Sequence, residues 1–595
     1  MAEDFRDLHG GVGVHGVAGR IDPAAFEYDR APAPVPVEAG GDKVRRVDFD
    51  PVSRVAGPLS FHTVLDLESR EVVEAAAMPN LFRGYEIILE GRDPRDALFV
   101  SSRACGVCGS AHAPTAALAV EMAFGIQPPP MAVAMRNLLL ACDALADYCT
   151  ELFTLAGPDY SEAIVRRNNP ELWERAQVTP APGVATHGFE RISHIMTGLG
   201  RLSGDLWAEA LHMSRIAKEA FVVIAGKHPH PQTTTPGGIS STVDTQDMNV
   251  MLLRVVQFLD YGQRVVAVWD DLVDFFYEAN PRYREVGAGP MNFIDFGLYD
   301  DPWAYDATFE GMSQWGESRW GTPGAVQDGR LVTTDLKRLN QGLEEFVEHS
   351  FYESWTGSHE FSSDPDGAAL SPNHPWNKQT VPAPGDPDLR GRYSWATAPR
   401  WDRQPVETGA YARLWTTALA NKMPHRRFIE PTGHSVKLAM PQGSLPAREL
   451  EWHVPQFWGA FERNRARAYA MAYTALVAYE HMLMGLDLLR KGQDAISVDF
   501  PYKIPKDFSV GVGLGGGSRG AISHHLVMDD KVMEKYQIIG PATFTAGPRD
   551  PFGNAGPLEQ AVGSTPLLSH ESSGEYIDVL RAIRSFDLCM ACTTH

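Results

Sequence analysis

Apolar side chains recur at helical spacing in several long segments of the chain. The clearest case lies between about 244 and 279, where Val250, Leu253, Val256 and Leu259 fall on one face of a helix. A stripe of this kind predicts an amphipathic helix that buries one face against a core. The same argument predicts further helices at about 131–156, 190–225, 456–491 and 572–585. Helices of this length predict a bundle.

The remaining segments lack this spacing. Residues 46–70 alternate apolar and polar side chains, which predicts a β-hairpin. Residues 282–425 are dense in Trp, Tyr, Pro, Gly and Asp, and predict a loop-rich region of short strands. We interpret the glycine-rich residues 500–565 as loops with short strands. Residues 1–45, rich in Gly, Pro and Ala, predict an irregular N-terminal arm.

Together these elements predict the fold class. The pattern indicates a mainly α protein of the α+β type, with a long-helix bundle as its core and β hairpins at its periphery. The chain has no internal repeat. We therefore expect residues 46–595 to form a single domain after the arm of residues 1–45.

Composition and charge narrow the classes of function. The 595 residues are 44% hydrophobic and 22% charged, which is typical of a globular protein. The formal net charge of −22 argues against a nucleic acid partner, because phosphate recognition needs a basic face. The chain has no run of about 18 apolar residues, and its N-terminus lacks an apolar stretch and twin arginines. We therefore expect no transmembrane segment and a cytoplasmic location.

Two cysteine motifs near opposite ends of the chain carry the candidate chemistry. The motifs are Cys105-x-x-Cys108, followed by His112, and Cys589-x-x-Cys592, followed by His595. The two pairs predict a site of four thiolates, and soft thiolates select zinc, iron–sulfur, copper(I) or nickel-type centres. Spacing alone leaves a structural zinc site that joins the two ends of the chain as an open alternative.

The residues around both motifs resemble one protein family. The segments that carry the likeness are 82–97, 226–232, 236–238, 393–395, 398–400, 518–520, 536–537 and 579–586. They resemble, in the same order along the chain, the large, catalytic subunit of nickel–iron hydrogenases. The likeness runs from about residue 46 to the end. It implies the large-subunit fold of that family and the oxidation of H2 as its reaction.

The resemblance implies a role for each of the four cysteines. In that family four thiolates hold nickel, and two of them bridge it to an iron that carries carbon monoxide and cyanide. By position, Cys105 and Cys589 are terminal nickel ligands, and Cys108 and Cys592 bridge the two metals. The split of H2 also needs a base for the proton. We expect the terminal thiolate of Cys589 to be the first proton acceptor.

Four neighbouring residues receive roles by the same resemblance. Arg519 matches the arginine that projects over the metals, where its charged, planar fork donates to a cyanide and polarises H2. We expect Asp587 to orient Arg519, and Asp147 aligns with a family aspartate near the same site. We expect His112 to donate a hydrogen bond to a bridging sulfur.

A second, hard metal site is implied near the C-terminus. The family binds magnesium with a glutamate, a backbone carbonyl and the terminal histidine, and the matching positions are Glu86, Ile538 and His595. So small a set of protein ligands suits Mg²⁺, which keeps several of its waters. The final His595 also implies that a maturation protease removes a C-terminal extension once nickel chaperones have delivered the metal.

Three departures from the family pattern indicate a divergent uptake branch, of the actinobacterial type. Ala56 stands where the family has the glutamate that takes the proton from the terminal thiolate. Leu588 replaces a proline, and Ala542 replaces a serine that donates to a cyanide. The residues beside that serine position, Pro541 and Thr543, remain as cofactor-binding candidates.

The alanine at position 56 raises the question of where the proton goes. Alanine cannot carry a proton, so another base must take it from Cys589, directly or through water. We expect Asp587 to be that base, because it lies two residues from Cys589. Glu86 with its metal-bound waters and His112 are the alternatives.

The resemblance also implies an iron–sulfur small subunit as partner. Four of the six cysteines belong to the motifs, and Cys142 and Cys149 lie in an apolar helical segment that predicts buried, inert thiols. No cysteine is left for a cluster that carries electrons away. We expect a heterodimer, or a dimer of such heterodimers, with the clusters only in the partner. Membrane association, or export by a twin-arginine signal on the partner, are alternatives to a cytoplasmic location.

Three other functions stay open at this point. They are an H2-sensing regulatory hydrogenase, the quinone-pocket subunit of respiratory complex I, and a structural zinc protein. The complex I subunit has lost its cysteines, so the four thiols argue against it. Nickel analysis separates the zinc protein from the hydrogenases, and turnover with H2 separates an enzyme from a sensor.

Overall fold

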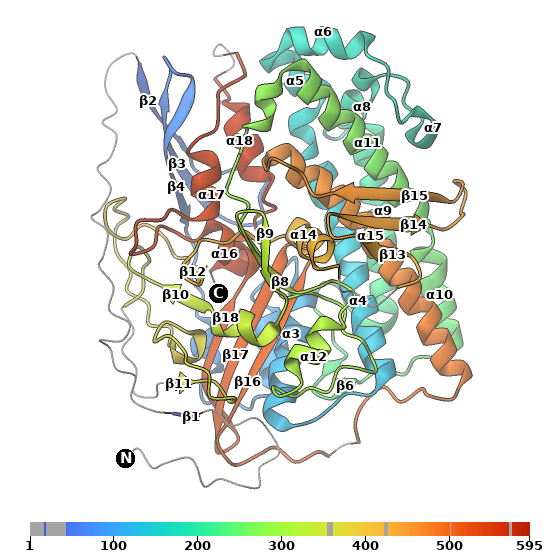
Figure 1. The fold of residues 1–595 in the computed structure, drawn as a ribbon, viewed down its shortest axis with the longest axis vertical. Helices are drawn as coiled ribbons and strands as arrows, with labels where there is room; N and C mark the ends of the chain where they lie inside the picture. Colours follow the sequence, from blue (N-terminus) through green and yellow to red (C-terminus); the bar gives the residue numbers. More distant parts are fainter. Residues whose placement is uncertain are drawn as a thin grey trace.

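Four long helices lie side by side on one side of the molecule (Figure 1). The computed structural model describes residues 17–18, 43–353, 361–421, 426–499, 501–570 and 574–594. The long helices are α4 (Pro130–Thr150), α9 (Asp205–Ala225), α11 (Gln257–Ala279) and α15 (Ala460–Arg490). Helix α4 packs on α9 and α15, and α11 packs on α15, which confirms the predicted bundle.

Two of the predicted helices are each divided in two. The segment 190–225 consists of α8 (Ile192–Gly198), a loop and α9. The segment 244–279 consists of α10 (Thr245–Val255) and α11, which are separated by Val256. In both cases apolar residues continue at helical spacing across the break, so periodicity alone predicts one helix instead of two.

Two other predicted helices change at their ends. Residues 131–156 form α4 and then a π-helix, η3 (Glu151–Leu155), which ends just before Gly157-Pro158. The prediction over 572–585 corresponds to α18 (Ile577–Arg584), and residues 572 and 573 lie outside the described residues. A π-helix is rare and often marks a functional site, so η3 is a feature to test.

The shorter helices connect and cover this frame. They are α1 (Tyr85–Leu89), α2 (Asp96–Ser102), α3 (Gly109–Phe124), α5 (Glu162–Asn168), α6 (Pro170–Val178), α7 (Val184–His187), α12 (Met312–Glu317), α13 (Leu336–Gln341), α14 (Ala410–Ala420), α16 (Pro541–Ala546), α17 (Pro557–Val562) and α19 (Met590–Thr593). Short 3₁₀ turns are η4 (Gly157–Tyr160), η5 (Pro281–Arg284) and η6 (Pro375–Asn377).

A central antiparallel sheet corrects the prediction of loops over 500–565. Its strands are β16 (Ser509–Gly517), β17 (Gly520–Asp529) and β18 (Val532–Ile539), in that order. The strands are almost wholly buried. Glycine is depleted in strands, so the glycine-rich segment was interpreted as loop.

The glycines of β16 let helix α3 lie directly on the sheet. A Cβ on Gly511 would overlap the carbonyl oxygen of Ala119, and a Cβ on Gly513 would overlap that of Thr115. Any other residue at these two positions would push the helix away. This close contact, called the glycine seam below, fixes the start of α3 against the turn between β16 and β17. Figure 1 shows α3 beside the sheet.

Smaller sheets surround the frame. The predicted hairpin over 46–70 is β2 (Val44–Phe49) and β3 (Leu59–Asp66), and β4 (Glu71–Pro79) adds a third strand. The region 282–425 contains α12, α13, α14 and short strands. The strands of the remaining sheets are β5 (Thr234–Thr235), β6 (Gly238–Ile239), β7 (Phe293–Asp295), β8 (Gly324–Gln327), β9 (Arg330–Thr333), β10 (Leu343–Phe346), β12 (Ala398–Trp401), β13 (Ile429–Pro431), β14 (Ser435–Met440) and β15 (Arg448–His453).

The N-terminal arm predicted over 1–45 lies mostly outside the described residues. Of this segment the structure describes residues 43–45 and strand β1 (Val17–Ala18), which pairs with β11 (Phe361–Ser363). In the described ranges, no helix is long and apolar enough to cross a membrane. The main hydrophobic core joins the long helices to all four motif cysteines.

Candidate metal centre

The four motif cysteines meet in the core of the molecule. Their sulfur atoms all lie within 4.8 Å of one another. Cys105 and Cys589 are 0% exposed, as is Cys592, and Cys108 is 2% exposed. In the part of the chain that the structure describes, this is the one group of three or more His, Cys, Asp or Glu side chains placed to hold a metal ion. Four soft sulfurs in a dry site fit a nickel-type or zinc-type centre.

Each pair of cysteines lies at the start of a helix. Cys108 directly precedes α3, and its sulfur lies 2.9 Å from that of Cys105. Cys589 directly precedes α19, and its sulfur lies 3.3 Å from that of Cys105. The sulfurs of Cys108 and Cys592 are 2.8 Å apart. The backbone N–H of Cys108 also donates to the sulfur of Cys105 over 2.9 Å.

The segment around Ala56 holds the second motif in place. The N–H of Ala56 donates to the carbonyl of Leu588 over 3.1 Å, and the N–H of Met590 donates to the carbonyl of Ala56 over 2.7 Å. Ala56 therefore pairs with Cys589 as a short parallel bridge. Position 56 lies beside Cys589, the expected terminal ligand, but the methyl group of Ala56 can neither accept nor release a proton.

Arg83 joins the two motifs, a role that the sequence did not suggest. Its Nη2 donates to the carbonyl of Ala104, next to the first motif, and over 2.6 Å to that of Ala591, inside the second. Arg83 was quoted only as part of a family-like segment. The sequence alone could not reveal this role, because the two motifs come together only in the folded protein.

Three of the four thiols differ in how their surroundings shift the pKa. Hydrogen bonds from the thiols of Cys105, Cys108 and Cys592, together with the charge of Arg519, hold the pKa of Cys589 well below its usual value. The hydrogen bond to Cys105 and burial raise the pKa of Cys108 well above its usual value, and burial does so for Cys592. The surroundings therefore favour ionisation of Cys589 over that of Cys108 and Cys592.

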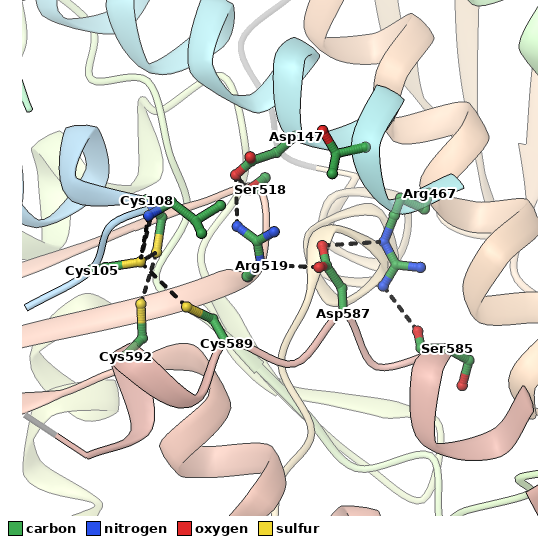
Figure 2. Close-up of polar contacts among 12 residues, drawn as sticks. Cys105, Cys108, Asp147, Arg467, Ser518, Arg519, Ser585, Asp587, Cys589 and Cys592 are labelled. Carbon is green, nitrogen blue, oxygen red and sulfur yellow. Dashed lines mark hydrogen bonds and ion pairs between the residues drawn. The ribbon is translucent and has the colours of Figure 1, made fainter. Parts of the chain in front are cut away.

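Arg519 lies between the cysteines and two carboxylates (Figure 2). Its Nη1 donates to Asp147 over 2.7 Å and its Nε to Asp587 over 3.0 Å. Its Nη2 is buried and has no hydrogen-bond partner among the described residues. Burial works against its charge, but Asp147, Asp587 and the sulfurs of Cys589 and Cys108 outweigh burial and hold its pKa well above the usual value. One donor is thus left for a group bound at the cysteines.

The two carboxylates are held in different ways. Asp147, on α4, also accepts from the hydroxyl of Ser518 over 2.6 Å, and burial raises its pKa to about 7 although the charge of Arg519 opposes this. Asp587 has a φ of 54°, a left-handed conformation that few non-glycine residues adopt. Its second oxygen, Oδ2, lies 3.9 Å from Nε of Arg467. The expected orientation of Arg519 by Asp587 agrees with this geometry.

His112 lies one turn along α3 from Cys108. Its Nδ1 lies 3.1 Å from Nε2 of His524, and Nδ1 of His524 lies 2.7 Å from the hydroxyl of Tyr536. These contacts run across β17 and β18. The expected hydrogen bond from His112 to a bridging sulfur remains a prediction.

The candidate magnesium ligands lie next to the same site. Glu86 is 1% exposed on α1, which contacts β18, and Ile538 is 0% exposed on β18. His595 lies outside the described residues. Glu86, Gln537 and Thr593 help to line a cavity of about 30 Å³, enough for a water or a small ion. Carboxylate and amide oxygens in this lining are of the kind that a hard cation binds, and Lys378 also lines the cavity. The magnesium site therefore remains a prediction.

Pro541 and Thr543 lie at the start of α16, against the C-terminal motif. The hydroxyl of Thr543 donates to the carbonyl of Cys592 over 3.2 Å. A Cβ on Gly540 would overlap this same carbonyl, so glycine is needed for the close approach. Pro541 is buried at the first position of the helix, where its missing N–H is not needed.

The remaining two cysteines are placed as expected. Cys142 and Cys149 are buried inside α4 and form no disulfide. Burial raises the pKa of Cys142 to about 12 and raises that of Cys149 further, so both stay protonated. They do not belong to the metal cluster.

Comparisons with known proteins agree with this site. A family model for the nickel-dependent hydrogenases matches residues 83–172 and 205–595, a span that includes both cysteine motifs. The quinone-reactive Ni/Fe-hydrogenase large chain of Wolinella succinogenes is 27% identical over 602 residues, which cover 93% of this chain and 96% of that one. The uptake hydrogenase large subunit of Rubrivivax gelatinosus is 26% identical, with 93% and 96% covered.

Solved structures show the same likeness. The actinobacterial-type NiFe-hydrogenase from Ralstonia eutropha H16 superposes with a TM-score of 0.90 at 38% identity, over 93% of this chain and 100% of that one. A [NiFeSe]-hydrogenase of Desulfomicrobium baculatum superposes with a TM-score of 0.69 at 25% identity, over 93% and 100%. The branch indicated by the three departures is thus also the branch of a structure with high similarity.

Proposed function

The chain belongs to the nickel-dependent hydrogenase family, as its large subunit, and we propose that it oxidises H2 to protons and electrons at a nickel–iron centre. One observation carries the proposal: a buried cluster of four thiols with an arginine donor left over beside it. When bound, the metal pair supplies the electron-rich centre at which H2 is split. A structural zinc site would need four sulfurs, but not the free donor of Arg519.

The residues around the cysteines have separate tasks in this proposal. Cys105, Cys108, Cys589 and Cys592 would hold the metals, and by the family resemblance Cys108 and Cys592 would be shared between them. Cys589, as a terminal ligand kept in its thiolate form by its surroundings, would be the first proton acceptor. Arg519 would be able to donate from its free Nη2 to a polar ligand of the metal centre, such as a cyanide, while Asp147 and Asp587 hold the other two nitrogens. Pro541 and Thr543 would help to shape the surroundings of such a ligand.

We also propose magnesium as a second metal, held by Glu86, the carbonyl of Ile538 and His595. The cavity beside Glu86, Gln537 and Thr593 supports this proposal. A cation at this place would hold α1 against β18 and the C-terminal motif. Its metal-bound waters would give protons a polar route past Glu86.

The first test is the metal content and the turnover of the purified protein. Co-expressed with its partner and maturation factors, the chain should contain nickel in near-stoichiometric amount and little zinc, and should reduce a dye with H2. Elemental analysis and a spectrophotometric assay measure both. Zinc in place of nickel would show a structural site. Nickel without appreciable turnover would show a sensor.

An iron–sulfur small subunit is the partner that we propose. Four cysteines form the cluster and two are buried in α4, so this chain has no further thiols for an electron carrier. We expect a tagged large subunit to co-purify with a protein that carries iron and acid-labile sulfide, and dye reduction to need both. An active large subunit that passes electrons to a protein acceptor alone would contradict this. The compartment then follows from any signal that the partner carries.

A further inference from the structure

Glu151 is a buried carboxylic acid that the proposed function does not yet use. It is 1% exposed and is the first residue of the π-helix η3, just after α4 ends. Its Oε1 has no hydrogen-bond partner among the residues that the structure describes. A buried polar atom without a partner needs a physical reason, because such atoms are rare in folded proteins.

Glu151 lies one turn after Asp147, and its N–H donates to the carbonyl of Asp147. Asp147 and Asp587 share Arg519 as donor, so Glu151 lies beside the polar cluster of the site. Burial raises the pKa of Glu151 well above its usual value, and the negative charge of Asp587 adds to this. Oδ2 of Asp587 also has no hydrogen-bond partner in the described chain. Buried carboxylates near one another repel each other unless one of them carries a proton, so this environment favours a proton on Glu151.

Two arginines lie near this carboxyl group, and their contacts bear on where the proton is held. Arg519 and Arg467 both act on Glu151 and favour its ionised form. Arg519, however, already donates to Asp587, and Arg467 also lies near that carboxylate. Among the described residues Glu151 forms no ion pair of this kind, and it is therefore the carboxyl group of this cluster that is left to take up and give off a proton.

Glu151 also lies on a path toward the surface. Thr154, one turn further along η3, has a buried hydroxyl without a partner in the described residues. Beyond it, Arg54 donates to the carbonyl of Leu155 over 2.5 Å and pairs with Asp159, and the Arg54 side chain is 20% exposed. Glu151 also acts on the charge of Arg584, a second partner of Asp159. Unpaired polar atoms in such a place suit ordered water.

We propose that Glu151 is the proton-relay residue of this centre, in place of an ionisable side chain at position 56. The inference rests on the proposed function, because H2 oxidation supplies the proton at Cys589. The hydrogen–sulfur bond at Cys589 breaks, and a hydrogen–oxygen bond forms at one oxygen of Glu151, with water as carrier where needed. The hydrogen that Glu151 already held leaves from its other oxygen to water. One proton enters, one leaves, and no electron moves.

The test replaces Glu151 with glutamine, which keeps the shape but cannot relay a proton. We expect Glu151→Gln to lower H2-dependent dye reduction per nickel by about 100-fold, within the range of a lost acid–base group. Glu151→Asp keeps the acid and should recover part of the turnover. Glu559→Gln is the matched control, because Glu559 is also buried with a raised pKa but lies on α17, outside the metal cluster. It should keep wild-type turnover.

Two further measurements separate a relay from a structural role. In the wild type, turnover should rise with pH as Glu151 becomes able to release its proton, and this limb should be absent in Glu151→Gln. The infrared spectrum of the wild-type complex near neutral pH should show a protonated carboxylic acid band that shifts in D2O and is missing in Glu151→Gln. That band does not depend on activity.

The outcomes distinguish the two proposals. Wild-type protein that contains zinc, or that never turns over H2, contradicts the proposed function. Active wild-type protein with full turnover and an unchanged pH profile in Glu151→Gln contradicts only the relay. A wild-type spectrum without the carboxylic acid band also contradicts the relay, whatever the turnover.

Discussion

Replacement of Cys589 with serine is expected to abolish H2 oxidation and to lower the nickel content of the purified protein. The serine oxygen is a hard donor and stays protonated, so it neither replaces a soft thiolate on nickel nor accepts the proton. The effect should be large because Cys589 supplies one of the four buried sulfurs of the cluster. Nickel per chain and dye reduction with H2 measure the two effects.

The matched control for this change is Cys142→Ser. Cys142 is also a buried thiol, but it lies inside α4 and outside the metal cluster. A serine there can donate to the carbonyl one turn earlier, so the helix should tolerate it. We expect wild-type nickel and turnover in this control. Normal activity in Cys589→Ser would remove Cys589 from the site and overturn the assignment.

Arg519→Lys should lower turnover by about 100-fold or more while most of the nickel stays bound. The loss of one fixed donor at a reacting centre typically has an effect of this size. A lysine ammonium is a compact charge that cannot reach Asp147 and Asp587 and still present a third nitrogen to the cysteines. Turnover per bound nickel is the quantity to measure, because it removes differences in metal loading.

Arg413→Lys tests whether this loss is specific to the site. Arg413 is another buried arginine, paired with Asp295 over 3.2 Å, and it donates to the carbonyl of Gly517 at the end of β16. Its replacement should lower stability but leave turnover per nickel near the wild-type value. If both variants lose turnover equally, packing around the β16–β17 turn explains the effect and Arg519 has no special role.

The long helices could be predicted because apolar periodicity is a local signal. Helix α15 and the bundle contacts of α4 follow from side chains that are near one another in the sequence. The break at Val256 escaped prediction because the apolar stripe continues through it. The β16–β18 sheet escaped for the opposite reason. Its glycines weaken the strand signal locally. Their role in close packing depends on α3, which is nearly four hundred residues away in the sequence.

Some residues of the candidate site could be predicted from the sequence and others could not. The four cysteines could be found because each motif is short and has recognisable neighbours. The pairing of Arg519 with Asp587 was expected from the family resemblance. Glu151 was missed, although one signal was present: a carboxylate inside the apolar pattern of residues 131–156. Such a residue is usually on the solvent side of a helix, and only its burial and its place one turn after Asp147 indicate another role.

The glycine seam has a mechanical consequence. Side chains change rotamer within picoseconds to nanoseconds where they have room, but two backbones in direct contact cannot slide without breaking a sheet or a helix. Cys105 and Cys108 directly precede α3 on one side of this contact, and Arg519 lies in the turn between β16 and β17 on the other side. The spacing between the soft ligands and their charged neighbour is therefore stiff. The C-terminal motif lies outside this contact and is held instead by Arg83 and by the segment around Ala56.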